Sequence, residues 1–233
     1  NVLDILHPNK KLRSLRLEMN PITFEQNKRL EKQINFIIEI DKVKNIIRKS
    51  LLFDGSRFEN VAEHSWTISI MAILLEEYAN FKVDIGKVQF MLLIHDIVEV
   101  YAGDTFLYSE DRKNAHSNEE KAAERIFGLL ESDQKKIFIN TWKEYEEKKT
   151  NEAKFALAFD RLQPIIQNYV NKGFTWKKHN VTYEQVVREN QCIREGSEEI
   201  WNFVQYVLQQ SVEKGYLAQN QSPIEENKEA LRK

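Results

Sequence analysis

The sequence predicts an all-α protein folded as a single helical bundle. The chain has 233 residues, of which 42% are hydrophobic and 30% charged, and this is enough for one substantial core. Its seven glycines and four prolines leave few residues for hairpin turns, and we find no internal repeat. Asp54-Gly55 is the one dipeptide typical of such turns, and we expect it to lie between helical segments. Apolar residues instead recur at intervals of three and four, as in helices.

Composition argues against several functional classes. With 34 basic and 36 acidic residues the net charge is −2, which does not favour a nucleic-acid partner. Cys192 is the single cysteine, so an internal disulfide and a cysteine-based zinc cluster are excluded, as in a reducing compartment. No apolar run approaches the ~20 residues of a membrane span, and residues 1–20 lack the hydrophobic region of a signal peptide. We therefore expect a soluble cytoplasmic protein without a membrane partner.

Three segments are expected along the chain. Residues 1–23 place basic side chains between leucines, a pattern that indicates a loosely docked amphipathic arm. Residues 24–210 are expected to hold the helical domain. Residues 211–233 are mostly polar and predict a frayed tail.

The first part of the domain predicts two helices followed by a loop. The first helix is indicated by the apolar series Phe24, Leu30, Ile34, Ile37 and Ile38. A second, short helix is expected through Val43 and Ile47. Arg48 and Lys49 would follow at its C-terminal end, where basic residues interact favourably with the helix dipole. Residues 51–60 are expected to form a loop.

The next helix is predicted to begin at a capping box, Asn60-x-x-Glu63. On this helix His64 shares a face with Ile68 and should therefore point into the core. A buried histidine of this kind is either a hydrogen-bonded core residue or a metal ligand. A second inward histidine on the following long helix favours a shared metal ion.

The central stretch from Phe90 to Val100 is apolar at every position except His95, Asp96 and Glu99. Such a stretch predicts a helix that is buried on all sides. At roughly 100° per residue, the three ionisable side chains point into one sector of this helix. Because an unpaired buried carboxylate is costly, the His-Asp pair requires a hydrogen-bonded partner or a metal ion.

The two ends of this central helix are also predicted. Asp84 is the expected N-terminal cap, and Gly103 should end the helix. Asp104 follows on the loop at the same end, where its carboxylate could reach the same point as the His-Asp pair. The alternative is a core hydrogen bond within that pair, with Glu99 turned outward.

Two further helices are expected after a polar loop over residues 105–116, which could cover the site and would leave His116 exposed. Ser117 is the predicted cap of a helix that runs to Leu130. The next helix is expected over residues 134–146, and its inward residues are Ile137 and Trp142.

The long helix that Thr150 is expected to open carries Asp160 among apolar neighbours. A salt bridge to Arg161 would explain this aspartate, but neighbouring helix residues do not face each other, which favours a metal ligand. The last long helix is predicted to begin at the cap Thr182 and to run through Leu208.

Four of the ionisable residues that stand on core-facing stripes can now be collected: His64, His95, Asp96 and Asp160. This order, a histidine, then a His-Asp pair, then an aspartate, resembles the HD-domain superfamily of metal-dependent phosphohydrolases. Three blocks, residues 57–66, 95–105 and 158–164, are similar to the subgroup that contains bacterial 5′-deoxynucleotidases. The similarity extends from about residue 24 to about residue 208.

The resemblance implies that these four residues bind one divalent metal ion, with Mn, Co, Fe, Ni, Zn and Mg as candidates. It also implies that Glu99 and Asp104 handle the attacking water and the proton transfer, and that Arg48 holds the phosphate. Lys49 stands where the subgroup has an aromatic residue implicated in recognising the sugar. A homodimer is a further implication.

The leading hypothesis is a metal-dependent phosphomonoesterase that converts (deoxy)ribonucleoside 5′-monophosphates, or another small phosphate ester, to alcohol and phosphate. Two imidazoles and two carboxylates leave coordination positions free on a metal ion, which suits activation of water. One alternative is a di-iron oxygenase, which needs more histidines between the His-Asp pair and Asp160, where only His116 lies. The others are a different nucleotide phosphohydrolase and a scaffold protein stabilised by its metal.

Overall fold

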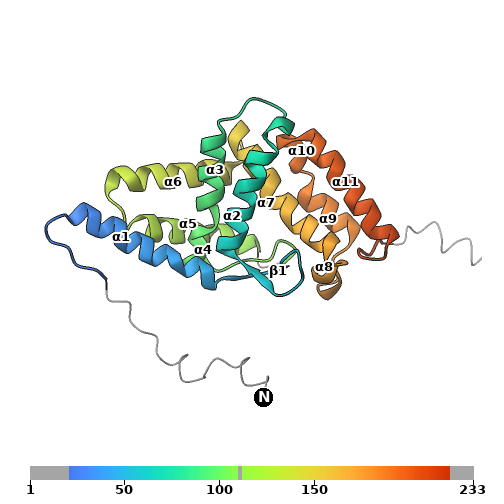
Figure 1. The fold of residues 1–233 in the computed structure, drawn as a ribbon, viewed down its shortest axis with the longest axis horizontal. Helices are drawn as coiled ribbons and strands as arrows, with labels where there is room; N and C mark the ends of the chain where they lie inside the picture. Colours follow the sequence, from blue (N-terminus) through green and yellow to red (C-terminus); the bar gives the residue numbers. More distant parts are fainter. Residues whose placement is uncertain (1–20, 110–111, 221–233) are drawn as a thin grey trace, which may run out of the picture.

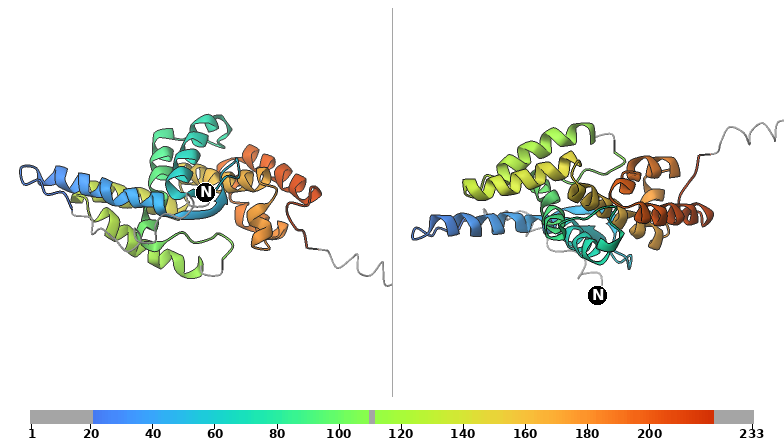
Figure 2. Two further views of the ribbon diagram at one scale, coloured as in Figure 1. Left: turned by 60° about the horizontal axis from the view of Figure 1, so that its bottom comes forward. Right: turned by 90° about the horizontal axis from the view of Figure 1, so that it is seen from above.

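The computed structural model describes residues 21–109 and 112–220, and it confirms the all-α prediction, with one small hairpin added (Figure 1). The molecule is elongated, with helices α1, α5 and α6 at one end and α8 to α11 at the other (Figure 2). The longest helix, α7 (Asn151–Val170), lies between them and contacts α2, α3, α6, α10 and α11. Thr150 caps α7 as predicted, because its side chain accepts a hydrogen bond from Ala153 N.

The first helix, α1 (Lys28–Ile40), leads into a 3₁₀ helix, η2 (Asp41–Asn45), and then into a strand. Strand β1 (Ile47–Leu51) pairs antiparallel with β2 (Phe58–Asn60). The prediction of a second α-helix ending at Arg48 and Lys49 was therefore wrong. Since side chains alternate along a strand, Arg48 is partly buried and Lys49 is exposed.

The connection between β1 and β2 is a turn that contains Asp54 and Gly55. The prediction that this dipeptide lies between helical segments was therefore also wrong. Gly55 has φ +72°, which a glycine adopts without strain, and Asp54 accepts a hydrogen bond from Ser56 N at 2.9 Å. The hairpin is anchored to the C-terminal half of the molecule. Thr175 Oγ1 donates to the carbonyl of Lys49, and Asn171 Nδ2 donates to that of Leu52, each at 2.9 Å.

Helix α2 (Val61–Leu74) begins at the predicted capping box. Asn60 Oδ1 accepts from Glu63 N and the Glu63 carboxylate accepts from Asn60 N, both at 3.0 Å. A 3₁₀ turn, η3 (Glu76–Tyr78), and helix α3 (Ile85–Ile94) follow. Asp84 caps α3 as predicted, accepting from Lys87 N at 3.2 Å.

The central helix is interrupted where a continuous one was expected. After α3 the chain winds as a 3₁₀ helix, η4 (His95–Val98), and then as α4 (Glu99–Ala102), which ends at Gly103 as predicted, with φ +80°. Side chains compete here for carbonyls that an α-helix would use. His95 Nδ1 donates to the carbonyl of Leu92 at 2.9 Å, and Trp142 Nε1 donates to that of His95 at 3.2 Å.

Helices α5 (Arg112–Phe127) and α6 (Ser132–Glu147) form the next pair. Ser117 lies inside α5, so its prediction as a cap was wrong, and the preceding loop is shorter than expected. His116 belongs to α5, and its side chain is outside the described residues. On α6 Trp142 is buried as predicted, but Ile137 is 55% exposed, because the inward stripe of this helix runs through Ile139 and Trp142 instead.

Three helices replace the single long one expected after Thr182: α9 (Tyr183–Asn190), α10 (Ile193–Gly196) and α11 (Glu198–Glu213). Helix α8 (Phe174–Lys178) precedes them. The break is fixed at Gly196, where a Cβ would lie 2.4 Å from the carbonyl oxygen of Lys154 on α7. Helix α11 continues past residue 210, so the packed domain extends beyond that predicted boundary.

The apolar core has two parts. One surrounds α7 and draws on α2, α3 and α8 to α11, whereas the other lies between α1, α5 and α6. The predicted arm, over residues 1–20, and the last thirteen residues of the predicted tail, from 221 on, lie outside the described residues. Among the helices that are described, none combines the length and apolarity needed to cross a lipid bilayer.

Candidate metal centre

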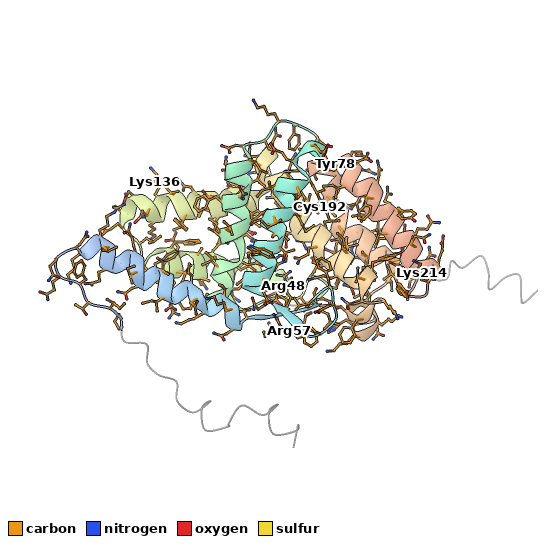
Figure 3. The ribbon with its side chains drawn as sticks, in the orientation of Figure 1. Arg48, Arg57, Tyr78, Lys136, Cys192 and Lys214 are labelled. Carbon is orange, nitrogen blue, oxygen red and sulfur yellow. The ribbon has the colours of Figure 1, made fainter. Side chains whose placement is uncertain are left out.

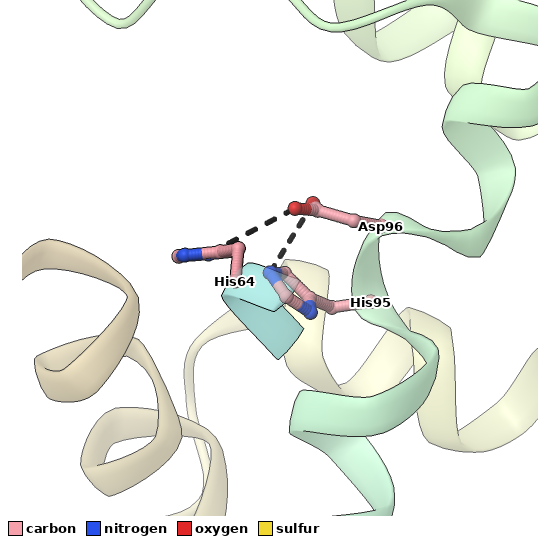
Figure 4. Close-up of side chains that lie close together, drawn as sticks. All are labelled: His64, His95 and Asp96. Atoms are coloured by element: carbon pink, nitrogen blue, oxygen red, sulfur yellow. Dashed lines mark ion pairs between the residues drawn. The ribbon is translucent and has the colours of Figure 1, made fainter. Parts of the chain in front are cut away.

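Four ionisable side chains meet where α2, η4 and α7 pack together. His64 Nε2 lies 3.1 Å from Asp160 Oδ1 and 3.9 Å from Asp96 Oδ2. His95 Nε2 lies 3.2 Å from Asp96 Oδ1 and 3.8 Å from Asp160 Oδ1. Figure 4 shows both histidines facing Asp96. The fold thus brings together the four residues singled out in the sequence.

The two histidines are oriented by hydrogen bonds on the side away from the carboxylates. His95 Nδ1 donates to the carbonyl of Leu92, which leaves Nε2 facing the cluster. His64 Nδ1 is hydrogen-bonded to the side-chain oxygen of Gln163, and Gln163 Nε2 donates to Glu59 Oε1 at 2.7 Å. This arrangement, with one ring nitrogen fixed and the other presented, is typical of histidines that bind metal ions.

The residues of the cluster fit a divalent metal ion. His95 Nε2 is buried without a hydrogen-bond partner in the described part of the chain, and such an atom is costly unless something binds it. One ligand atom each from His64, His95 and Asp96 lies within 4.8 Å of the others. Imidazole nitrogens combined with carboxylate oxygens are the donors that ions such as zinc, manganese or iron take in proteins.

Mutual electrostatics keep the carboxylates of the cluster ionised. Burial raises the pKa of Asp160, but the two histidines lower it well below its usual range. Burial also raises the pKa of Asp96, but the charge and hydrogen bond of His95, together with the charges of Arg48 and His64, lower it below its usual range. Burial lowers the pKa of His95, but the neighbouring carboxylates Asp96 and Asp160 raise it well above its usual range. Ionised carboxylates are the form that binds cations.

Arg48 reaches the cluster from strand β1 and lies inside the molecule near the foot of α2 (Figure 3). Its Nη1 donates to Asp96 Oδ2 at 3.0 Å, and its Nε lies 3.7 Å from Glu59 Oε2. Burial lowers the pKa of this guanidinium, but the surrounding carboxylates raise it above its ordinary value. Arg48 is therefore a fixed positive charge beside the candidate ligands.

A pocket of about 400 Å³ opens onto the cluster and is lined by Arg48, Glu99 and Asp104 as well as by the candidate ligands His95, Asp96 and Asp160. Burial raises the pKa of Glu99 well above its usual range, and the charges of Asp96 and Asp104 raise it further. Burial likewise raises the pKa of Asp104. Carboxyl groups with raised pKa values can exchange protons near neutral pH.

Two residues beside the cluster were not singled out in the sequence. Tyr145 donates from its hydroxyl to Asp160 Oδ2 at 3.1 Å, and Gln163 supports His64 as described. Helical spacing could have found both, because Gln163 follows Asp160 by three positions and Tyr145 follows the inward Trp142 by three. The salt bridge considered for Asp160 is only a 3.8 Å contact with Arg161 Nε, too long for a hydrogen bond.

The fold and this site define a class of protein, an all-α domain with a buried cluster of two histidines and two aspartates suited to a divalent metal ion. A family model of the HD domain matches residues 40–201. The chain belongs to the HD domain family.

Relatives and solved structures agree with this family. The human 5′-deoxynucleotidase HDDC2 is 26% identical over 136 residues, which cover 58% of this chain and 65% of the relative. The chain thus spans just under two thirds of that relative's length. The Xenopus laevis protein of the same name is 28% identical over 136 residues, which cover 58% of this chain and 66% of the relative.

Among solved structures, a predicted metal-dependent phosphohydrolase from Magnetospirillum magnetotacticum MS-1 is 47% identical, with a TM-score of 0.80. The match covers 84% of this chain and 100% of that one. A conserved hypothetical protein from Pyrococcus furiosus is 22% identical, with a TM-score of 0.55, and covers 77% of this chain and 99% of its own. The latter shares the fold.

Proposed function

We propose that this protein is a metal-dependent phosphohydrolase that converts (deoxy)ribonucleoside 5′-monophosphates to nucleoside and phosphate. The observation that carries the proposal is the cluster of His64, His95, Asp96 and Asp160 at the wall of a pocket that also holds an arginine and two protonatable carboxyl groups. The names of the relatives support it, since they include a 5′-deoxynucleotidase and a predicted metal-dependent phosphohydrolase.

The two histidines and two aspartates are, in this proposal, the residues that would hold one divalent metal ion. Such an ion lowers the pKa of bound water and polarises a phosphoryl oxygen. Gln163 and the carbonyl of Leu92 keep the coordinating nitrogens of the histidines turned toward the ion's position. The identity of the metal is left to experiment among Mn, Co, Fe, Ni, Zn and Mg.

The remaining roles fall to residues on the pocket wall. Arg48 presents planar donors that bind phosphate oxygens, and its contact with Asp96 keeps it beside the cluster. Glu99 and Asp104 orient the attacking water, accept its proton and return a proton to the leaving alkoxide. Burial raises the pKa of both carboxyl groups, which favours their taking up a proton during this exchange.

Phosphate release from a panel of ribo- and deoxyribonucleoside 5′-monophosphates tests the proposal. The purified chain is treated with a chelator and then supplied with Mn, Co, Fe, Ni, Zn or Mg one at a time. We expect release to stop on chelation and to return with at least one metal. No release with any ester or metal would overturn the proposal, and two irons per chain with an oxygen requirement would support the di-iron alternative instead.

We also propose that the protein is a cytoplasmic homodimer. A single cysteine, Cys192, is typical of proteins from reducing compartments. On α2, Trp66 and Leu74 are 65% and 69% exposed, and Ile70 and Ile73 of the same helix are exposed too, which is typical of a surface that binds protein. Light scattering should give about twice the chain mass of 27.6 kDa, and a value near 27.6 kDa would contradict the dimer.

A further inference from the structure

Arg161 is a largely buried arginine on the wall of the pocket. It follows Asp160 on α7, and its side chain is only 12% exposed. Its Nε is buried and has no hydrogen-bond partner among residues 21–109 and 112–220. The carboxylate beside it, Asp160, lies 3.8 Å from this nitrogen. A guanidinium keeps its charge in proteins and offers five N–H donors, so burial in this state is costly unless another group binds it.

The pocket that holds the candidate metal ligands is also the pocket that Arg161 lines. Neighbouring amide side chains on this wall are already committed to the protein. Asn168 accepts from two backbone N–H groups of α8, at 3.1 and 3.2 Å, and donates to a carbonyl of α7 at 3.0 Å. Asn190 donates to the carbonyl of Val186 at 2.7 Å and to the hydroxyl of Tyr108 at 3.2 Å. Arg161 has donors left for a ligand.

The two arginines of the pocket, Arg48 and Arg161, differ in how closely carboxylates contact them. Arg48 is hydrogen-bonded to Asp96 and lies 3.7 Å from Glu59. Within the described part of the chain, Arg161 makes only the longer contact with Asp160. Arg161 lines the same pocket as Arg48 and Asp160, so an anion bound in this pocket shares it with both guanidinium groups. Planar guanidinium groups bind phosphate oxygens through paired N–H donors.

We infer that Arg161 is a second phosphate-binding residue of this site, which donates hydrogen bonds to oxygens of the phosphoryl group that Arg48 also contacts. The inference rests on the proposed function, because it places a phosphate ester in the pocket. The ester and the released inorganic phosphate both present these oxygens. Arg161 therefore contributes to the affinity for both.

Inorganic phosphate is the probe for the experiment. Its binding to the metal-loaded full chain is measured by calorimetry for wild type, Arg161→Gln and Arg161→Lys, together with KM and kcat for a nucleoside 5′-monophosphate. Loss of a charge-assisted hydrogen bond predicts that Arg161→Gln weakens phosphate binding about 10- to 100-fold and raises KM to match, with metal content unchanged. Arg161→Lys keeps the charge without the paired donors, so its phosphate affinity should be intermediate.

Arg188→Gln is the matched control, because Arg188 on α9 is 66% exposed. Unchanged phosphate affinity in Arg161→Gln overturns the inference, and so does loss of the metal ion along with phosphate in both Arg161 variants. If wild type hydrolyses no ester, the proposed function fails, yet a specific loss of phosphate binding in the Arg161 variants still supports the inference. Hydrolysis with normal KM and phosphate affinity in Arg161→Gln overturns the inference alone.

Discussion

Replacing Gln163 by Met tests whether the residues behind the cluster set its affinity for metal. Gln163 is fully buried on α7, where it is hydrogen-bonded to His64 through its oxygen and donates to Glu59 at 2.7 Å. Methionine has a similar length and fills irregular space well. The change therefore removes two hydrogen bonds without opening a large cavity.

The size of the effect follows from the two partners. A hydrogen bond to a carboxylate such as Glu59 contributes about 1.5–3 kcal/mol, and the bond to His64 about 1 kcal/mol. Glu59 Oε2 already lacks a hydrogen-bond partner among the described residues, so the loss of Gln163 leaves this buried carboxylate still less satisfied. We expect the free energy of unfolding to fall by about 2.5 to 4 kcal/mol. Because His64 loses the contact that orients its ring, the Kd for metal should rise about 10- to 100-fold.

Gln167→Met is a matched control on the same helix. Gln167 lies one turn beyond Gln163 and is also buried, but neither of its amide atoms has a hydrogen-bond partner in the part of the chain described. Removing an unsatisfied amide should leave the free energy of unfolding unchanged or raise it. Urea unfolding and competition with a chromophoric chelator measure the two quantities. Equal metal affinity in wild type and Gln163→Met, or equal losses in both variants, would refute the reasoning.

Four further results are expected. Asp96→Ala should lose metal and activity together, as elemental analysis and phosphate release will show, and retained stoichiometric metal would contradict its role as a ligand. Glu99→Gln should keep the metal and lower kcat by about 10²- to 10⁴-fold, whereas a near-normal rate would exclude proton transfer by Glu99. Lys49→Trp should change the ratio of kcat/KM for deoxyribo- over ribonucleotides by about tenfold, because an aromatic ring replaces a flexible cation at the pocket, and an unchanged ratio would rule this out. Chelation should lower the free energy of unfolding by about 2.7 kcal/mol relative to protein in free metal at 100 times Kd, and identical melting curves would exclude a bound metal.

The cluster could be predicted from the sequence because its members are ionisable residues at positions where an inward helical stripe is normally apolar. Apolar helical stripes are interrupted by His64, His95, Asp96 and Asp160. Burying such residues costs free energy unless they pair with one another or bind a common ion. Spacing alone placed them on inward faces, and the packing of α2, η4 and α7 brings them within hydrogen-bonding distances. The burial of Trp142 and the caps at Asn60 and Thr182 were likewise readable from local pattern.

What could not be predicted depends on contacts between distant segments. The 3₁₀ winding at His95 involves a hydrogen bond from Trp142, which is 47 residues away. The hairpin had a local signal in Asp54-Gly55, but strand β2 has only three residues, too few to show alternation. The break at Gly196 comes from close approach to the backbone of α7. The spacing of apolar residues within one segment gives no information about contacts with distant segments.

The hairpin places the residues that would bind the substrate on a different part of the fold from the candidate metal ligands. The candidate metal ligands come from helices buried in the core, whereas Arg48 and Lys49 come from a strand that is fastened to the C-terminal helices mainly through backbone carbonyls. Contacts made through backbone atoms do not depend on which side chains the strand carries. Substitutions at the exposed positions between Leu51 and Arg57, other than Gly55, can therefore accumulate while the metal centre stays intact. Under the proposed function, this allows the same metal centre to be adapted during evolution to different phosphate esters.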